Sequence, residues 1–329
     1  MRGKIFKGEE TINKMVNEDI HILLFYKFIP IDDLEYFVRT HARKCKELGI
    51  FGKVLVAHEG VNGSVSGTQE QLEQYKTFVR SLPGFADVWF KEEIGKSHPF
   101  NKMIVRIREE IVSLKRAVDM TKKRKYVSPD EFLKAYEQEE DFIVLDARND
   151  YEYTLGRFKK AINPAIKTFR EFPAFVNEFK KQVSPDKKIF IYCTGGIRCE
   201  KASVYMEEQG FSNVHQLQGG IINFCQQKPN TLWEGKCFVF DKRLVSDLGQ
   251  GNTPITYCVS CGTVCDLLRN CKYVRCDKLV VQCSNCQEQL HGCCSKQCMH
   301  TFLQYSKERA EKKKKGEWVA PKLEQTYAI

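Results

Sequence analysis

The most informative segment of this sequence is Tyr192-Cys193-Thr194-Gly195-Gly196-Ile197-Arg198-Cys199. It follows an apolar run, Lys188 to Tyr192, and precedes a segment whose apolar residues recur at helical spacing up to Gly210. A strand that passes through a glycine-containing loop into a helix is typical of parallel α/β sheets, which place ligands beyond the carboxyl ends of their strands. Cys193 is expected at such an end.

The loop is predicted to hold an ionised, nucleophilic sulfur. Its two glycines let the backbone wrap inward, so that N–H groups and the N-terminus of the following helix converge on the thiol. That field and a nearby arginine lower a cysteine pKa. An inert core cysteine, the alternative, would not explain this Gly-Gly loop with its arginine. The candidate catalytic residue is Cys193, and the candidate loop residues are Thr194, Gly195, Gly196, Ile197 and Arg198.

The loop length distinguishes two chemistries. Phosphatases with a cysteine nucleophile place five residues between cysteine and arginine, whereas four separate Cys193 from Arg198. The smaller ring suits a sulfur atom or another small group. Cys199, on the first turn of the helix, either resolves an oxidised or persulfidated Cys193 or packs in the core.

Composition favours a folded protein of two or three domains. The chain has 329 residues, of which 42% are hydrophobic and 29% charged, which excludes general disorder, collagen and low-complexity sequence. It contains no run of about 18 consecutive apolar residues and no signal-peptide apolar region, so a cytoplasmic location is expected. The net charge of +10 favours a polyanionic partner.

The first block has the pattern of a ferredoxin-like, or acylphosphatase-like, α+β domain. The motif Glu59-Gly60-Val61-Asn62-Gly63 contains an Asn-Gly pair and predicts a hairpin turn, and Thr68 with Gln71 predicts a capping box. These elements approach the order β-α-β-β-α-β. The predicted strands cover 20–31, 53–57, 64–67, 86–90 and 103–108, and the predicted helices cover 34–48 and 68–82.

A basic run marks the best domain boundary. It consists of Lys122, Lys123, Arg124 and Lys125, which are also candidate contacts for a nucleic acid, although a solvated linker explains them equally well. The predicted domains are residues 1–120, the α/β domain 121–226, a cysteine-rich segment 227–300 and a basic tail 301–329. The tail, with Lys312 to Lys315, is expected to fray and is a second candidate for contacts to phosphates.

The cysteines are concentrated in the third block. Ten of the 15 lie between Cys258 and Cys298, and such clustering in a reducing compartment indicates metal thiolates. The spacing allows two interleaved four-cysteine zinc sites of the closed, structural kind. Cys265, Cys293, His291 and His300 are alternative ligands. The predicted metal ligands are Cys258, Cys261, Cys283 and Cys286 in one site and Cys271, Cys276, Cys294 and Cys298 in the other.

Short motifs surround the Cys193 loop in a fixed order. They are Val144-Leu145-Asp146-Ala147-Arg148, Tyr151-Glu152, Gly156-Arg157-Phe158, Ala161-Ile162-Asn163-Pro164 and, after the loop, Leu217-Gln218-Gly219-Gly220-Ile221. With them, residues 126 to 226 resemble a rhodanese domain. The resemblance implies that Asp146 and Arg148 brace one another or the loop, with a surface ion pair as the alternative.

The order of the blocks carries a wider resemblance. The Glu59–Gly63 motif, then His98-Pro99-Phe100-Asn101-Lys102-Met103, the Cys193 loop and the cysteine-rich tail together resemble the tRNA uridine hydroxylase family of rhodanese-containing proteins. This implies oxygen-dependent conversion of wobble uridine to 5-hydroxyuridine in tRNA, which requires the loop cysteine. It implies tRNA as partner and dioxygen as co-substrate. No organic cofactor is identifiable from the motifs.

Two other functions fit the same residues. A rhodanese-type sulfurtransferase would carry a persulfide on Cys193, and the chemistry of the loop taken alone favours it. A noncatalytic redox or scaffolding module would tolerate replacement of Cys193 and depend on the tail instead.

Overall fold

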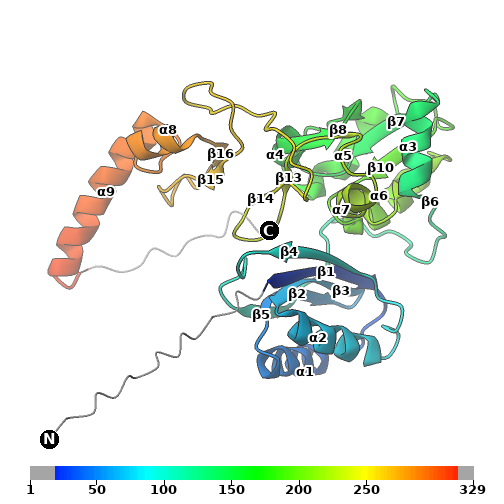
Figure 1. Ribbon diagram of the computed structural model, residues 1–329, viewed down its shortest axis with the longest axis horizontal. Helices are drawn as coiled ribbons and strands as arrows, with labels where there is room; N and C mark the ends of the chain where they lie inside the picture. The colour runs from blue at the N-terminus through cyan, green and yellow to red at the C-terminus, as the bar shows by residue number, and fades with distance from the viewer. Residues whose placement is uncertain (1–18, 318–329) are drawn as a thin grey trace, which may run out of the picture.

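The computed structural model describes residues 19–317, and the rest of the chain lies outside this range. It contains a lower α+β domain, an upper α/β domain and a C-terminal segment that ends in a long helix (Figure 1). Within residues 19–317, no helix has the length and apolar character required to cross a membrane.

The N-terminal domain is a five-stranded sheet with two helices on one face (Figure 1). Its strand order, β4-β1-β3-β2-β5, contains the ferredoxin-like order and adds β5 in parallel to β2. The capping box of Thr68 and Gln71 is present at the start of α2. The elements are β1 (Ile20–Phe28), α1 (Leu34–Glu47), β2 (Phe51–Ala57), β3 (Gly60–Gly67), α2 (Gln69–Ser81), β4 (Phe90–Gly95) and β5 (Met103–Ile107).

Two local predictions in this domain are wrong. The Asn-Gly pair is not a turn, because β3 already begins at Gly60 and Gly63 pairs with Phe25 of β1. A Cβ at Gly63 would lie 2.5 Å from the Phe25 ring, so glycine is needed there for packing. The strand predicted over 86–90 begins only at Phe90, because Phe85 and Val88 pack into the core through successive turns.

The middle domain is a parallel α/β sheet, as predicted. Its strand order is β6-β11-β10-β7-β9, and every pair in it is parallel. The strands are β6 (Tyr126–Val127), β7 (Ile143–Asp146), β9 (Ala161–Ile162), β10 (Ile189–Tyr192) and β11 (Val214–Leu217), and the helices are α3 (Pro129–Glu137), α4 (Asp150–Leu155), α5 (Phe172–Phe179), α6 (Ile197–Glu208) and α7 (Gly220–Gln227), with a short 3-10 turn at Phe169–Glu171.

Each face of this sheet has its own core, because buried parallel strands alternate between two covered faces. Ile189 and Ile191 of β10 pack with α5 and α6, whereas Phe190 and Tyr192 pack with α3 and α7. Cys193 belongs to the first core, where β10 ends.

The C-terminal segment joins the middle domain and then extends away from it. Strand β12 (Trp233–Gly235) pairs with β8 (Gly156–Phe158), and four short strands and two helices follow. These are β13 (Cys237–Phe238), β14 (Val245–Ser246), β15 (Leu268–Asn270), β16 (Leu279–Val281), α8 (Ser284–Gln289) and α9 (Lys296–Lys314).

The prediction that the chain frays beyond Cys298 is wrong as far as Lys314, where α9 ends. Ser295 caps the helix by accepting a hydrogen bond from the Cys298 N–H. The following residues are rich in glutamate, lysine, arginine and alanine, all good helix formers. Residues 318–329 of the predicted tail lie outside the described range.

Candidate active site

The Cys193 loop is held in place by the start of α7. The backbone N–H groups of Ile221 and Ile222 donate to the carbonyls of Cys193 and Thr194 at 3.0 and 3.1 Å. A Cβ at Gly220 would lie 2.3 Å from the Cys193 carbonyl oxygen, so only glycine permits this approach. The backbone N–H of Gly196 points inward and donates to Cys193 Sγ at 3.2 Å.

This environment ionises Cys193. Burial of the side chain, which is 1% exposed, favours the neutral thiol and is the largest single influence on its pKa. It is outweighed by the hydrogen bond from the Cys199 thiol, the positive charge of Arg198 and the N–H groups of Arg198 and Cys199. Together they lower the pKa of Cys193 to about 6, so the thiolate predominates near neutral pH.

Cys199 differs from its neighbour in its protonation state. It is fully buried, and burial and the adjacent Cys193 raise its pKa well above the ordinary range. It therefore remains a thiol and donates to Cys193. Its role as a resolving thiol stays a prediction.

Arg198 does not project into the loop as an unpaired cation. Its two terminal nitrogens donate to the Glu152 carboxylate at 2.6 and 2.8 Å in a buried, two-pronged ion pair. Its guanidinium also lies 5.6 Å from the centre of the Phe240 ring. Arg198 thus links α6, α4 and the C-terminal segment behind the sulfur.

Asp146 and Arg148 brace one another, and the surface ion-pair alternative is wrong because both side chains are completely buried. Arg148 Nη2 lies 2.6 Å from Asp146 Oδ2 and donates to the Gly156 carbonyl at 2.7 Å. The hydroxyl of Tyr192, the residue before Cys193, donates to the same aspartate at 2.6 Å. The pair therefore anchors the strand end from which the loop begins.

The N-terminal domain lies directly over the loop. A Cβ at Gly195 would lie 2.6 Å from Leu24 Cδ2, and one at Gly196 would lie 2.8 Å from the Tyr26 hydroxyl. Trp89 makes the same kind of close approach to Gly219. The glycines of the loop thus accommodate a neighbouring domain as well as the turn. We call Leu24, Tyr26, Trp89 and Lys91 the roof of the site.

Ion pairs and hydrogen bonds fix the roof on α6. Glu200 accepts from the Tyr26 hydroxyl at 3.0 Å and lies 2.7 Å from Arg124 Nε. The next residue, Lys201, lies 2.8 Å from Glu59 and 2.7 Å from Glu110. Glu59 therefore lies in the turn of the predicted β2–β3 hairpin and also contributes an interdomain contact.

Lys91 is a residue that sequence reasoning missed. It lies on β4 opposite Leu24 of β1 and is only 4% exposed. Its ammonium nitrogen is 4.4 Å from the centre of the Trp89 ring and 4.9 Å from that of Tyr26. Burial lowers the pKa of Lys91 to about 8, and the negative charges of Cys193 and Glu200 oppose that shift.

The ten clustered cysteines provide two sets of four thiols. The ligand atoms within each set lie within 4.8 Å of one another. The sets are Cys258, Cys261, Cys283 and Cys286, and Cys271, Cys276, Cys294 and Cys298, which is the interleaved grouping. A tetrahedral zinc with bonds of about 2.3 Å requires sulfurs about 3.8 Å apart. Cys276 and Cys294 are 3.8 Å apart, and Cys261 and Cys283 are 3.6 Å apart, so the thiols fit zinc.

Comparisons with known proteins match three successive parts of the chain. Family models match residues 20–111 (UPF0176 acylphosphatase like domain), 128–227 (Rhodanese-like domain) and 234–299 (Rhodanase C-terminal). A tRNA uridine(34) hydroxylase of Bacillus licheniformis is 43% identical over 297 residues, which cover 87% of this chain and 91% of the relative. The chain belongs to the tRNA uridine(34) hydroxylase family.

A second relative agrees with this assignment. The tRNA uridine(34) hydroxylase of Cytophaga hutchinsonii is 42% identical over 285 residues, which cover 85% of this chain and 90% of the relative. Among solved structures, the rhodanese-like domain of an Anabaena protein matches with a TM-score of 0.30 and 19% identity, over 34% of this chain and 80% of that one.

The basic run of this hydroxylase-family chain is less available than predicted. Arg124 is turned inward to Glu200, because that buried carboxylate needs a cation. Lys122 lies 3.4 Å from Glu208, and Lys125 donates to the Ser212 carbonyl. Contact of this run with RNA stays a prediction, and its lysines are the residues that would make the contact.

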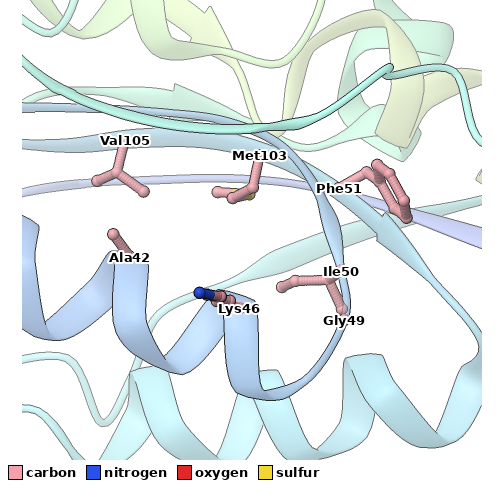
Figure 2. Close-up of a pocket in the computed structure, with 7 residues that line it drawn as sticks. All are labelled: Ala42, Lys46, Gly49, Ile50, Phe51, Met103 and Val105. Atoms are coloured by element: carbon pink, nitrogen blue, oxygen red, sulfur yellow. The ribbon is translucent and has the colours of Figure 1, made fainter.

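The structure also has hollows away from the Cys193 loop. A cavity of about 380 Å³ lies between α1 and β5. Its lining residues, shown in Figure 2, are Ala42, Lys46, Gly49, Ile50, Phe51, Met103 and Val105. None of these residues belongs to the Cys193 loop, so this cavity is not the candidate active site. The second hollow, of about 230 Å³, is lined among others by Lys53, Lys102, Lys242 and Phe240, the ring that contacts Arg198. Asp241 also lines it and is paired with Arg243.

Proposed function

We propose that this protein hydroxylates the wobble uridine of tRNA at C5 in an oxygen-dependent reaction that requires Cys193. The observation that carries the proposal is the buried thiolate at the end of β10, with a pKa lowered to about 6, in a chain of this family. A uridine in an anticodon loop is unpaired and can be turned out into a pocket at low cost.

The thiolate gives C5 the reactivity that hydroxylation needs. Sulfur adds to C6 of the uracil ring, the C5–C6 double bond opens, and its electron pair passes to C5 and the O4 carbonyl as an enolate. C5 then attacks the terminal oxygen of a hydroperoxide, which dioxygen forms with two electrons from an external reductant. The C5–O bond forms, the O–O bond breaks, and the second oxygen leaves as hydroxide. Loss of the C5 proton and departure of sulfur restore the double bond and the thiolate.

The charge of the molecule supports an RNA partner. The net charge of +10 favours phosphate binding. The hollow lined by Lys53, Lys102 and Lys242 adjoins Phe240, which contacts Arg198 behind the sulfur. We infer that this hollow receives the phosphates that flank the target uridine.

Analysis of tRNA nucleosides tests the proposal in cells. Cells that lack the protein should lose 5-hydroxyuridine and nucleosides derived from it, and the wild-type chain should restore them. The Cys193→Ala variant should restore nothing, whereas Cys225→Ala is the matched control, because burial raises the pKa of that thiol and keeps it inert. Full restoration by Cys193→Ala would contradict the proposal and favour a noncatalytic module.

Sulfur transfer is the second candidate, and the short loop with an adjacent Cys199 thiol favours it. A persulfide on Cys193 would thiolate RNA or another acceptor, and its loss would remove thiolated nucleosides instead. Exchange of oxygen for sulfur and addition of oxygen change the nominal mass almost equally. Growth in isotopically labelled dioxygen separates the two, because only hydroxylation places the label at C5.

The covalent step has its own test. A tRNA that carries 5-fluorouridine at the wobble position blocks loss of the C5 substituent and should trap the enzyme as a protein–RNA adduct. The adduct should map to Cys193 and be absent with Cys193→Ala. Its absence with the wild-type chain would refute addition of sulfur to C6.

The proposed zincs act on structure. Each set of four thiols would surround one ion completely and leave no position for substrate. When bound, the ions would cross-link a segment with few buried apolar side chains of its own.

A further inference from the structure

The roof places one cation against the loop from another domain. Leu24 and Lys91 are directly opposite partners on adjacent strands, so their side chains project from the same face of the sheet. Leu24 reaches Gly195, and Tyr26, two residues further along β1, reaches Gly196. Lys91 therefore lies on the face that covers the sulfur, beside two side chains that touch its loop.

Lys91 is buried without the usual partner. Among residues 19–317, no carboxylate lies within ion-pair distance of its ammonium group, which instead contacts the rings of Trp89 and Tyr26. A buried ammonium is costly unless an anion compensates it. The negative charges that act on Lys91 are those of the Cys193 thiolate and of Glu200.

The carboxylates next to the loop are already matched. Glu152 is engaged by Arg198 through two hydrogen bonds. Glu200 is 2.7 Å from Arg124 and also accepts from Tyr26. Among residues 19–317, the Cys193 thiolate and the Lys91 ammonium are the charges at the loop that no ion pair matches fully, because Arg198 divides its charge between Glu152 and the sulfur.

We propose that Lys91 is the counter-cation of the Cys193 thiolate, a positioning residue that the N-terminal domain supplies to the rhodanese loop. The inference rests on the thiolate of the proposed function and adds where its compensating charge comes from. It makes the active site composite: β10 and α6 hold the sulfur, and β4 stabilises its charge. The groups that face the sulfur are Arg198 and Cys199 from α6, Tyr26 from β1 and Lys91 from β4.

Ultraviolet titration of the thiolate in the full chain tests this inference. The difference in absorbance between each variant and the same variant with Cys193→Ser isolates one sulfur among the 15. Lys91→Met removes the charge, keeps the apolar stem and relieves a buried cation, so we expect it to fold. Lys96→Met is the matched control, because it removes an exposed charge just beyond the same strand.

We expect Lys91→Met to raise the titration midpoint of Cys193 by about 0.5 to 1 pH unit, a three- to tenfold loss of thiolate well below the midpoint. Lys91→Arg should keep the midpoint near that of the wild type, and Lys96→Met should not move it. An unchanged midpoint in Lys91→Met, or an equal rise in Lys96→Met, would overturn the inference.

This titration is carried out without tRNA, so its result does not depend on whether the protein hydroxylates uridine. Suppose that Lys91→Met raises the midpoint and that cells lacking the protein keep their wobble nucleosides. The role of Lys91 as counter-cation would then be supported, and hydroxylation would be rejected. An unchanged midpoint with loss of 5-hydroxyuridine would do the reverse.

Discussion

At the scale of single residues, the charge state of Cys193 results from two large opposing influences. Burial favours the thiol, whereas hydrogen bonds from the loop and Cys199 and the charge of Arg198 favour the thiolate. An ordinary buried cysteine of this chain shows the other outcome, because burial raises the pKa of Cys45 to about 12. Reactivity here therefore depends on polar neighbours rather than on exposure.

The first prediction follows from linkage. The pKa of Cys193 is lowered from an ordinary value of 9.0 to about 6 in the folded chain, so the thiolate stabilises the fold above about pH 9. That contribution is lost as the pH falls towards 6, and the loss lowers the free energy of unfolding by an amount on the order of 2 to 4 kcal/mol. Urea unfolding of wild type and Cys193→Ser from pH 6 to 9 should give a stability difference that shrinks as the pH falls.

Cys225→Ser provides the control for this series. Burial raises the pKa of Cys225, so its thiol remains neutral in the folded chain over most of the range. Its stability difference should not follow the course expected for Cys193. If the free energies of unfolding of Cys193→Ser and wild type followed parallel curves against pH, that result would contradict the lowered pKa.

The second prediction concerns the Glu152–Arg198 ion pair. Glu152→Gln leaves the buried guanidinium without its anion and should lower the free energy of unfolding by about 3 to 5 kcal/mol. Glu178→Gln breaks the pair with Lys181, in which both side chains are exposed, and should cost less than about 1 kcal/mol. Equal losses in urea unfolding would show that the buried pair contributes nothing special.

At the scale of elements, two helix N-termini form the loop together. Helix α6 begins where the loop ends, and α7 donates two N–H groups to carbonyls of the loop. The conformation therefore depends on the junction of β11 and α7 as much as on the residues beside the sulfur. The motif Leu217–Ile221 acquires a physical role here, which is to fix the loop from outside.

A glycine pair tests this junction. Gly220 has φ +67° and a Cβ there would meet backbone oxygen at 2.3 Å, whereas Gly210 has φ +105° with nothing within 4 Å. Gly210→Ala should cost about 1 to 2 kcal/mol for its conformation alone. Gly220→Ala should cost clearly more in urea unfolding and should also move the thiolate titration of Cys193. A similar small cost for both variants would contradict the close approach.

The elements themselves could mostly be predicted from sequence. Periodicity and caps locate α1 and α2, because both are local signals. The Asn-Gly pair misled, because its glycine serves a contact with Phe25 on another strand. α9 was missed because its charged composition resembles a solvated tail, although Ser295 provides a start signal.

At the scale of the whole molecule, the C-terminal thiols should control the stability of one segment. We expect two zincs per chain, and their removal by a chelator should unfold residues 258–298 while the parallel sheet persists. Metal analysis and hydrogen exchange would measure both effects. Cys258→Ser should lose one zinc, whereas Cys265→Ser, outside both sets, should keep two. Retention of two by Cys258→Ser would reject the grouping.

The sulfur loop could be predicted from sequence, but the roof could not. The loop is contiguous, so its glycines, cysteine and arginine are visible together. Lys91 and Cys193 are 102 residues apart in sequence, and they come together only through domain docking. A signal existed: Ile22, Leu24, Tyr26 and Phe28 occupy the second face of β1, and an antiparallel strand that is apolar on both faces must be covered twice.

Coverage of the sulfur by Leu24 and Tyr26 affects the resting enzyme. The roof blocks the access of peroxides and alkylating agents to Cys193, which is 1% exposed. A substrate base that contacts the sulfur must therefore displace part of this cover. The same cover protects the reduced nucleophile from oxidants in solution.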